Sequence, residues 1–461
     1  MRFVGGFILL FSLFRIGYAQ EAGVPLSVDE AVKLALAQNL DLQTSRDRVI
    51  STEISVETAK SEFRLNIRPD ISGLYQQNDE LDQNYGVKFS KRFTTGSEAS
   101  WEVRTQVDDS EDEDEPYQTD VILAYTQPLL RGRGKLATTN QLVSAQEQQV
   151  IQRRNYLLTQ QRLIVQVVAS YYDIVRDQLL IGVHERAVER ADLLKQAAEA
   201  KLKVGMASKM DVFRAELQLL NAQNRVVDAR ASFENALRRF NVLLGNVTDM
   251  RYTFVSALEY TPVELDQEEL IRQALEHRLE LQTARDRINE AERQLKIAKQ
   301  NLLPPLDVSV RYTFRGTGEA FDQSWNTDDE FWGVGLSSSF DIDRAQERAN
   351  YQQAQLTLNA TLRDLQAAQD DIISEVMQTI VSVRQAQASV ELQAQSVTQA
   401  EKQLELSSLR YKKGLSDNLE VVESEDNLMN AKNGYYSAVA QHLAATLRLR
   451  QVTGTLEVPS P

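Results

Sequence analysis

Alternating apolar and polar residues mark two stretches of the chain as strands. In residues 307–314 the alternation is strict, and one face carries Val308, Val310, Tyr312 and Phe314. This period of two is typical of a strand with one apolar and one polar side. Because similar runs recur four times in the first half, we predict four strands over 69–128 and two over 306–341.

A helical spacing takes over after each strand region. Between Phe340 and Gly414 there is no glycine or proline, and the apolar residues step by threes, fours and sevens, as in Leu358, Leu362, Leu365, Ile372, Val376, Ile380 and Val383. This is the seam of a coiled coil, and about 70 residues at ~1.5 Å each give a rod on the order of 105 Å. We predict long helical hairpins over 133–245 and 343–454, each turning at a glycine.

Two further helical segments, 27–66 and 265–303, precede the strand regions. Each ends at proline, which cannot continue a helix. Each opens with a capping box, Ser27 with Glu30 and Asp266 with Glu269.

The chain is an internal repeat. Residues 26–50 align without gaps on residues 265–289 and share the core Leu-Asp/Glu-Leu-Gln-Thr-x-Arg-Asp-Arg, and a second block at the hairpin turns aligns in the same order. We therefore expect two homologous halves, 20–245 and 246–461, with the same succession of elements.

The first nineteen residues are interpreted as a secretory signal peptide, because a short apolar stretch follows Arg2 and cleavage is expected before Gln20. The chain has no cysteine, which excludes disulfides and a lipoprotein anchor. Its net charge of −15 disfavours binding to nucleic acid.

Six strands in one chain are too few for a closed barrel, since single-chain barrels of this kind begin at about eight. An open edge in lipid leaves unpaired backbone groups that cost several kcal/mol each. The strands must then pair with those of sister subunits. We predict an α+β fold in which an outer-membrane β-barrel, completed by sister subunits, continues into a long coiled-coil α-helical barrel in the periplasm.

Two motifs resemble the TolC-like outer-membrane efflux protein family: Thr-Gln-Pro-Leu-Leu-Arg-Gly at 126–132 and Tyr-x-x-Gly-x6-Val at 411–421. The resemblance covers nearly the whole mature chain. It implies a homotrimer in outer-membrane lipid that docks onto a periplasmic adaptor and serves an inner-membrane pump of the RND or ABC type, exporting small molecules or polypeptides. Family members have twelve strands per trimer, whereas four strands in this first half would make eighteen.

The resemblance also assigns roles at the hairpin turns. Asp211 matches a tip aspartate, and Glu420 and Glu423 match two acidic positions that line a periplasmic constriction, where their spacing of three places them on one helix face. Tyr411 matches a tyrosine that links neighbouring hairpins in the closed state. The basic partner expected two residues after the second turn glycine is absent, because that position is Ser416. The alternative is that these are ordinary solvated charges.

Small residues at the turns are expected to admit an adaptor hairpin, and their alternative role is simple helix capping. The small residues are Gly205, Ala207, Ser208 and Gly414, and the expected docking positions also include Leu415 and Ser416.

No feature indicates an enzyme, a cofactor or a metal site. The three histidines, His184, His277 and His442, stand apart from any metal-ligand spacing, and no nucleophile elbow or phosphate loop is present. The competing class is a secreted coiled-coil scaffold without a channel, which accounts for the rods and leaves the alternating strands unexplained.

Overall fold

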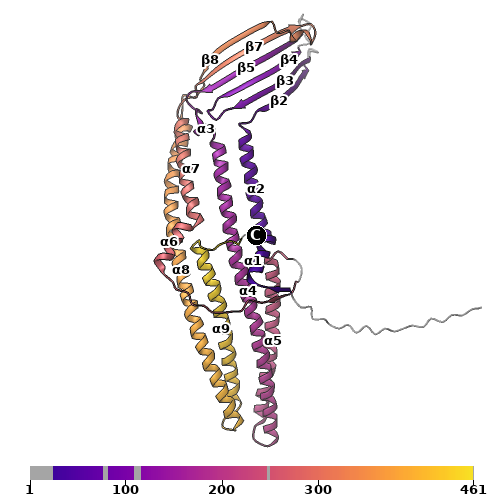
Figure 1. The fold of residues 1–461 in the computed structure, drawn as a ribbon, viewed down its shortest axis with the longest axis vertical. Coiled ribbons are helices and arrows are strands. Elements are labelled where there is room, and N and C mark those ends of the chain that lie inside the picture. Colours follow the sequence, from indigo (N-terminus) through magenta and orange to yellow (C-terminus); the bar gives the residue numbers. More distant parts are fainter. Residues whose placement is uncertain (1–23, 76–80, 108–115, 247–249, 460–461) are drawn as a thin grey trace, which may run out of the picture. The chain divides into compact units, whose positions relative to one another are not determined.

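The computed structural model describes residues 24–75, 81–107, 116–246 and 250–459 (Figure 1). The predicted signal peptide, 1–19, lies outside the described residues.

The chain divides into two compact units, each with segments from both sequence halves. The tip unit comprises the described parts of 1–38, 167–260 and 390–440, and the sheet unit those of 39–166, 261–389 and 441–461. The sequence repeat and the compact units are therefore different divisions of the same chain.

The sheet unit contains one six-stranded antiparallel sheet in the order β2-β3-β4-β5-β7-β8. Its strands are β2 (Asn66–Tyr75), β3 (Leu81–Arg92), β4 (Glu98–Val107), β5 (Tyr117–Pro128), β7 (Asp307–Gly318) and β8 (Asp329–Ser337). The predicted number of strands, four in the first region and two in the second, is confirmed for the described residues. Figure 1 shows β2 and β8 at the two edges of this sheet, and each has a neighbouring strand on one side only.

One face of the sheet is apolar. The cross-strand register aligns Phe89, Trp101, Leu123, Tyr312 and Trp332 in one row. The rings of Phe89 and Trp101 stack with centroids 5.0 Å apart, and Trp332 is 75% exposed. A row of large exposed apolar side chains is what a lipid-facing strand surface requires.

The opposite face is charged. Asp120 is paired in register with Arg104 on one side and Arg315 on the other. Its carboxylate lies 3.3 Å from the Arg104 guanidinium and 2.8 Å from that of Arg315. Asp120 on β5 is buried and pairs with one arginine on β4 and one on β7. Ion pairs therefore link three strands on this face, and the other face carries apolar rings.

The predicted helical segment 27–66 is two helices, α1 (Val28–Gln38) and α2 (Leu40–Ser61). Asn39 interrupts it with an extended backbone, and its Oδ1 accepts a hydrogen bond of 3.0 Å from the Leu42 amide. The helix ends five residues earlier than predicted, because β2 already begins at Asn66. Segment 265–303 is divided in the same way at Arg278, into α6 (Gln267–His277) and α7 (Leu279–Asn301).

The predicted hairpins consist of long helices. α4 (Asn140–Lys203), preceded by the short α3 (Lys135–Thr138), is followed by α5 (Lys209–Leu243), and α8 (Ala345–Lys412) by α9 (Leu419–Val452). No helix among the described residues combines the length and apolar character needed to cross a membrane. In the sheet unit the predicted seam residues Ile372, Val376, Ile380 and Val383 are buried together with Leu281 and Leu449.

The tip unit contains a parallel pair of short strands that the sequence analysis did not predict, β1 (Val24–Leu26) and β6 (Tyr252–Phe254). Tyr171 on α4 is fully buried beside them. Its hydroxyl donates to the Leu26 carbonyl at 2.8 Å and accepts from the amides of Val255 and Ser256 at 3.2 and 3.1 Å. One side chain thus fixes both short strands to the helix.

Gly245, after α5, provides a test of this packing. Its φ is +83°, and a Cβ there would lie 2.3 Å from the Gln38 carbonyl oxygen. We expect Gly245→Ala to destabilise the protein by about 2 kcal/mol or more, because both the backbone and the contact are incompatible with a side chain. The apparent Tm from circular dichroism at 222 nm measures this.

Gly182→Ala is the matched control. Gly182 lies inside α4, and no atom lies within 4 Å of the position that its Cβ would take. This variant should be neutral or more stable by about 0.5–1 kcal/mol, since alanine favours a helix interior. Equal Tm values for the two variants would contradict the role assigned to Gly245.

Candidate functional site

The two hairpin turns lie in the tip unit and have the same backbone design. Gly205 and Gly414 have φ of +78° and +74°. After Gly205 the Met206 amide bonds the Lys201 carbonyl at 2.8 Å, and after Gly414 the Leu415 amide bonds the Arg410 carbonyl at 2.9 Å. Both glycines therefore cap a helix C-terminus in the left-handed conformation that glycine adopts most readily.

Asp211 is held in a capping box at the start of α5. Its carboxylate accepts bonds of 2.8 Å from the amide and the hydroxyl of Ser208, and the Ser208 hydroxyl accepts from the Asp211 amide at 3.1 Å. Arg214 lies 3.9 Å from the same carboxylate. Asp211 and Ser208, both predicted from the sequence as tip residues, thus form the N-terminal cap of a helix.

Tyr411 is buried between the two hairpins of one chain. Lys201, at the end of α4, lies with its ammonium 3.7 Å from the centre of the Tyr411 ring and donates to the Tyr411 carbonyl. Burial, and then the negative charge of Asp211, raise the pKa of the tyrosine hydroxyl. That hydroxyl has no hydrogen-bond partner among the described residues.

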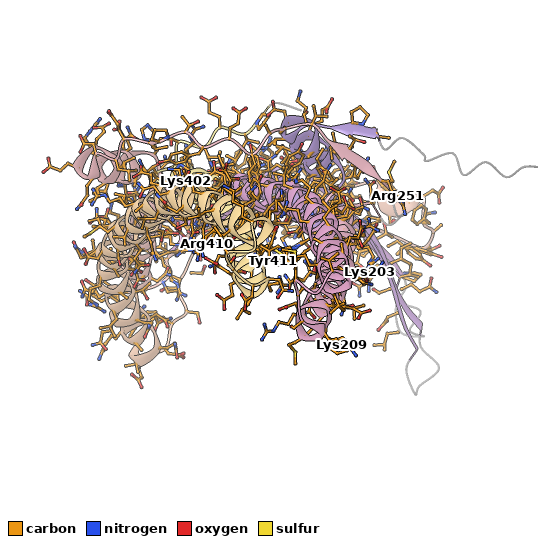
Figure 2. All side chains as sticks on the ribbon, turned by 90° about the horizontal axis from the view of Figure 1, so that it is seen from below. Lys203, Lys209, Arg251, Lys402, Arg410 and Tyr411 are labelled. Atoms are coloured by element: carbon orange, nitrogen blue, oxygen red, sulfur yellow. The ribbon has the colours of Figure 1, made fainter. Side chains whose placement is uncertain are left out.

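The two predicted constriction glutamates have different surroundings. Glu420 is half-buried, and its Oε1 lies 3.0 Å from the Arg410 guanidinium in the last turn of α8. Glu423 is exposed, and no ion pair to it is found among the described residues. One carboxylate is therefore paired within the chain, and the other is open to solvent. Figure 2 shows Arg410 and Tyr411 at the end of α8, with Lys203 and Lys209 flanking the other turn.

Further polar contacts bind the hairpins together. The Asn418 amide group donates to the Asp211 carbonyl at 2.6 Å, and Arg214 lies 3.8 Å from Asp417. Farther from the turns, the Arg190–Glu425 and Arg225–Asp426 pairs are 2.6 and 2.9 Å apart. Around them, an apolar cluster contains Leu194, Ala198, Ala215, Leu404, Tyr411 and Leu428.

The predicted docking positions are accessible on the turns. Gly205, Ser208, Gly414 and Leu415 are exposed, while Ala207 and Ser416 are partly exposed. A Cβ on Gly414 would lie 4.0 Å from the Met206 methyl group, so the two turns of one chain are neighbours.

Three basic residues of this site were missed by the sequence analysis: Lys201, Arg214 and Arg410. A base was expected two residues after Gly414, where Ser416 stands. The base that pairs with Glu420 instead comes four residues before that glycine, from Arg410. The sequence signal for Arg410 was its position one helical turn before the glycine cap, where a base is favoured at a helix C-terminus.

No cluster of three or more His, Cys, Asp or Glu side chains suited to a metal occurs in the described part of the chain.

These features, an apolar-faced sheet with open edges and two paired helical hairpins, define a subunit of a membrane channel. A profile of the outer membrane efflux protein family matches residues 31–246 and 270–455. The chain belongs to this family and is an outer-membrane efflux protein.

Individual relatives are distant. Outer membrane protein TolC of Escherichia coli (strain K12) is 23% identical over 66% of this chain and 64% of its own length, so the match spans less than two thirds of that relative. Outer membrane efflux protein BepC of Brucella suis biovar 1 (strain 1330) is 22% identical over 95% of this chain and 87% of its own. The solved structure of the outer-membrane channel OprN, 18% identical, superimposes with a TM-score of 0.71 over 94% of this chain and 91% of that one, which confirms the fold.

The contact between Lys201 and Tyr411 predicts how the turns are held. Lys201→Met removes the cation–π contact and one hydrogen bond, which together contribute about 1–2 kcal/mol. We therefore expect the fraction of molecules in which the two turns are apart to rise about tenfold. Spin labels on Met206→Cys and Leu415→Cys, in a chain that has no other cysteine, report the separation by pulsed electron resonance.

Lys203→Met is the control, because Lys203 is exposed and lies two residues farther along α4. It should leave the shortest label-to-label distance unchanged. If both variants give the wild-type distance distribution, Lys201 does not hold the turns together.

Proposed function

We propose that this chain is one of three identical subunits of a channel that crosses the outer membrane and continues as a helical duct through the periplasm. The observation that carries the proposal is the six-stranded sheet with an exposed apolar face and two unpaired edges, β2 and β8. In lipid, each unpaired backbone group costs several kcal/mol, so the edges must be paired by other subunits.

Three copies supply eighteen strands. Barrels of 16–18 strands leave an aqueous channel, whereas barrels of about eight are filled by their own side chains. The charged face of the sheet, with Arg104, Asp120 and Arg315, is suited to line such a channel, and the apolar face with Trp101 and Trp332 to contact lipid.

The helical hairpins support an export role. Helices α4 and α8, of 64 and 68 residues, are on the order of 100 Å long, which exceeds a bilayer by a factor of about three. As part of the same proposal, the hairpin turns dock onto a periplasmic adaptor that joins the channel to an inner-membrane pump of the RND or ABC type. The cargo is small molecules or polypeptides. Membership of the outer membrane efflux protein family and the similarity to BepC support the export role.

The turns contain the proposed constriction and docking positions. Three copies of Glu420 and Glu423 around a threefold axis form two acidic rings, and Tyr411 and Asp211 hold the turns in the closed arrangement. The burial of Tyr411 between the two hairpins, beside Lys201, supports this role. The exposed turn residues Gly205 and Leu415, with Ala207, Ser208, Gly414 and Ser416 beside them, support docking of an adaptor hairpin.

The first test is assembly. We expect native mass spectrometry in detergent to find three chains per particle and no folded monomer, because a lone subunit leaves the β2 and β8 edges unpaired. Circular dichroism of any monomer fraction should show loss of the strand signal. A stable monomer with its full strand content would refute the shared barrel.

The second test is ion selectivity of single channels in planar bilayers under a salt gradient. Glu423→Gln should lower the preference for cations about twofold or more, because an exposed ring of charge concentrates counter-ions. Glu420→Gln should have a smaller effect, since Arg410 already neutralises that carboxylate at 3.0 Å.

Arg410→Gln is the informative counterpart, because it frees Glu420 and should raise the preference for cations. Trimer formation should be unchanged in all three variants, whose sites lie in the tip unit and outside the sheet. Wild-type selectivity in all three would show that these glutamates are ordinary surface charges.

A further inference from the structure

The segment between β7 and β8, residues 319–328, folds back onto the sheet. It contains a short 3-10 helix, η1 (Gln323–Trp325). The buried Ser324 hydroxyl lies 2.8 Å from that of Thr119 on β5, which lies 2.9 Å from that of Thr105 on β4. A row of three hydroxyl groups therefore fixes this segment, here named the β7–β8 loop, to two strands.

The register shows which face the loop covers. Thr119 lies two and four residues before Val121 and Leu123 on β5, and the pairing of β5 with β7 runs without interruption. Since side chains alternate between faces with a period of two, Thr119 points to the same side as Leu123. The β7–β8 loop thus lies on the apolar face, and the Asp120 ion pairs lie on the other.

Two glycines on β7 confirm this placement. A Cβ on Gly316 would lie 2.3 Å from the Ser324 carbonyl oxygen, and one on Gly318 would lie 2.6 Å from the Gln323 Cβ. Gly316 is paired with Thr119, and both glycines direct their missing side chains toward the loop. Glycine is required here because the loop backbone approaches the strand closely.

The outer surface of the loop is aromatic. Phe321 and Trp325 are 51% and 50% exposed. Their ring centroids are 6.2 Å apart, and Phe321 meets Tyr117 edge-on at 6.4 Å. Large rings left half in solvent are unusual for an aqueous loop and common where a barrel meets the membrane boundary.

The height of the apolar band explains the need for such a loop. From Val308 to Phe314 the apolar face of β7 spans six residues, about 15 Å along the membrane normal for a strand tilted by about 40°. The apolar band of an outer-membrane barrel is about 25 Å tall. Beyond Phe314 the same face continues with Gly316 and, on β4 and β5, with Thr105 and Thr119, and the loop covers these positions with aromatic rings.

We propose that the β7–β8 loop is a membrane anchor whose Phe321 and Trp325 insert at the boundary between the acyl chains and head groups of the outer leaflet. The proposal rests on the barrel of the proposed function. Extending the band to Gly318 gives ten residues, or about 25 Å at the same tilt. This length includes one acid on the same face, Glu330 on β8 opposite Phe314, whose carboxylate accepts a hydrogen bond of 2.6 Å from the Tyr312 hydroxyl. The exposed acids Glu319, Asp322 and Asp328 confine the loop to the boundary, because a carboxylate in the hydrocarbon core costs about 2.5–3.5 kcal/mol.

A neighbouring subunit is a less suitable partner for the loop. The seam between subunits is formed by the free edges of β8 and β2. The Ser324 hydroxyl of the loop contacts β5, and the loop backbone lies closest to β7. The loop therefore covers the sheet of its own chain, on the side of β8 that faces away from that seam.

The three tryptophans of the chain, Trp101, Trp325 and Trp332, allow a direct test in proteoliposomes. With Trp101→Phe and Trp332→Phe, only Trp325 remains. We expect lipids brominated near the head-group end of the acyl chain to reduce its emission roughly twofold, because the ring lies at that boundary. Aqueous iodide should have little effect.

The matched variant, Trp101→Phe with Trp325→Phe, leaves Trp332 in the middle of the apolar face and tests the barrel itself. If brominated lipid quenches Trp332 and only iodide quenches Trp325, the β7–β8 loop is not a membrane anchor, and the proposed barrel is still supported. If lipid quenches neither tryptophan, the proposed channel fails as well. Tyrosine replaces phenylalanine in both sets if a phenylalanine variant does not form trimers.

Discussion

The hydrogen-bonding needs of two strand edges determine most of this structure. Strands β2 and β8 each have a partner on one side only, while one face of their sheet is apolar enough for lipid. Hydrocarbon provides no substitute partner for an amide or a carbonyl. The sheet is therefore complete only in an assembly of several chains, and the symmetry of that assembly is imposed on every element that continues from the sheet.

At the hairpin turns, polar and charged groups also need partners, and here most of the partners come from the same chain. Arg410, Lys201 and Arg214 satisfy Glu420, the Tyr411 carbonyl and Asp417 inside the subunit. Of the two glutamates predicted for the constriction, Glu423 is the one without an ion pair in the described part of the chain. Because its carboxylate is also exposed, Glu423 is available to an adjacent subunit or to passing ions.

The sequence predicted elements whose signal is local and periodic. The alternation of apolar and polar residues located six strands, and the glycine-free run before Gly414 located α8. Elements that depend on distant contacts were not predictable. Strands β1 and β6 are three residues each, and both are fixed by Tyr171, which lies more than eighty residues from Leu26 and from Val255 in the sequence. The β7–β8 loop was also missed, since its position depends on a hydroxyl row across three chain segments and not on any pattern within the loop.

The candidate site shows the same division between backbone and side chains. The two turns align in the sequence repeat and share one cap geometry, because a glycine cap is encoded by a few adjacent residues. Their side-chain contacts do not follow the repeat. Lys201 and Arg410 occupy equivalent positions, yet Arg410 pairs within its own hairpin and Lys201 reaches across to Tyr411. Two hairpins that are alike in backbone therefore differ in how they are held, since Lys201 adds one contact between hairpins to the Arg190–Glu425 and Arg225–Asp426 pairs, and Arg410 adds none.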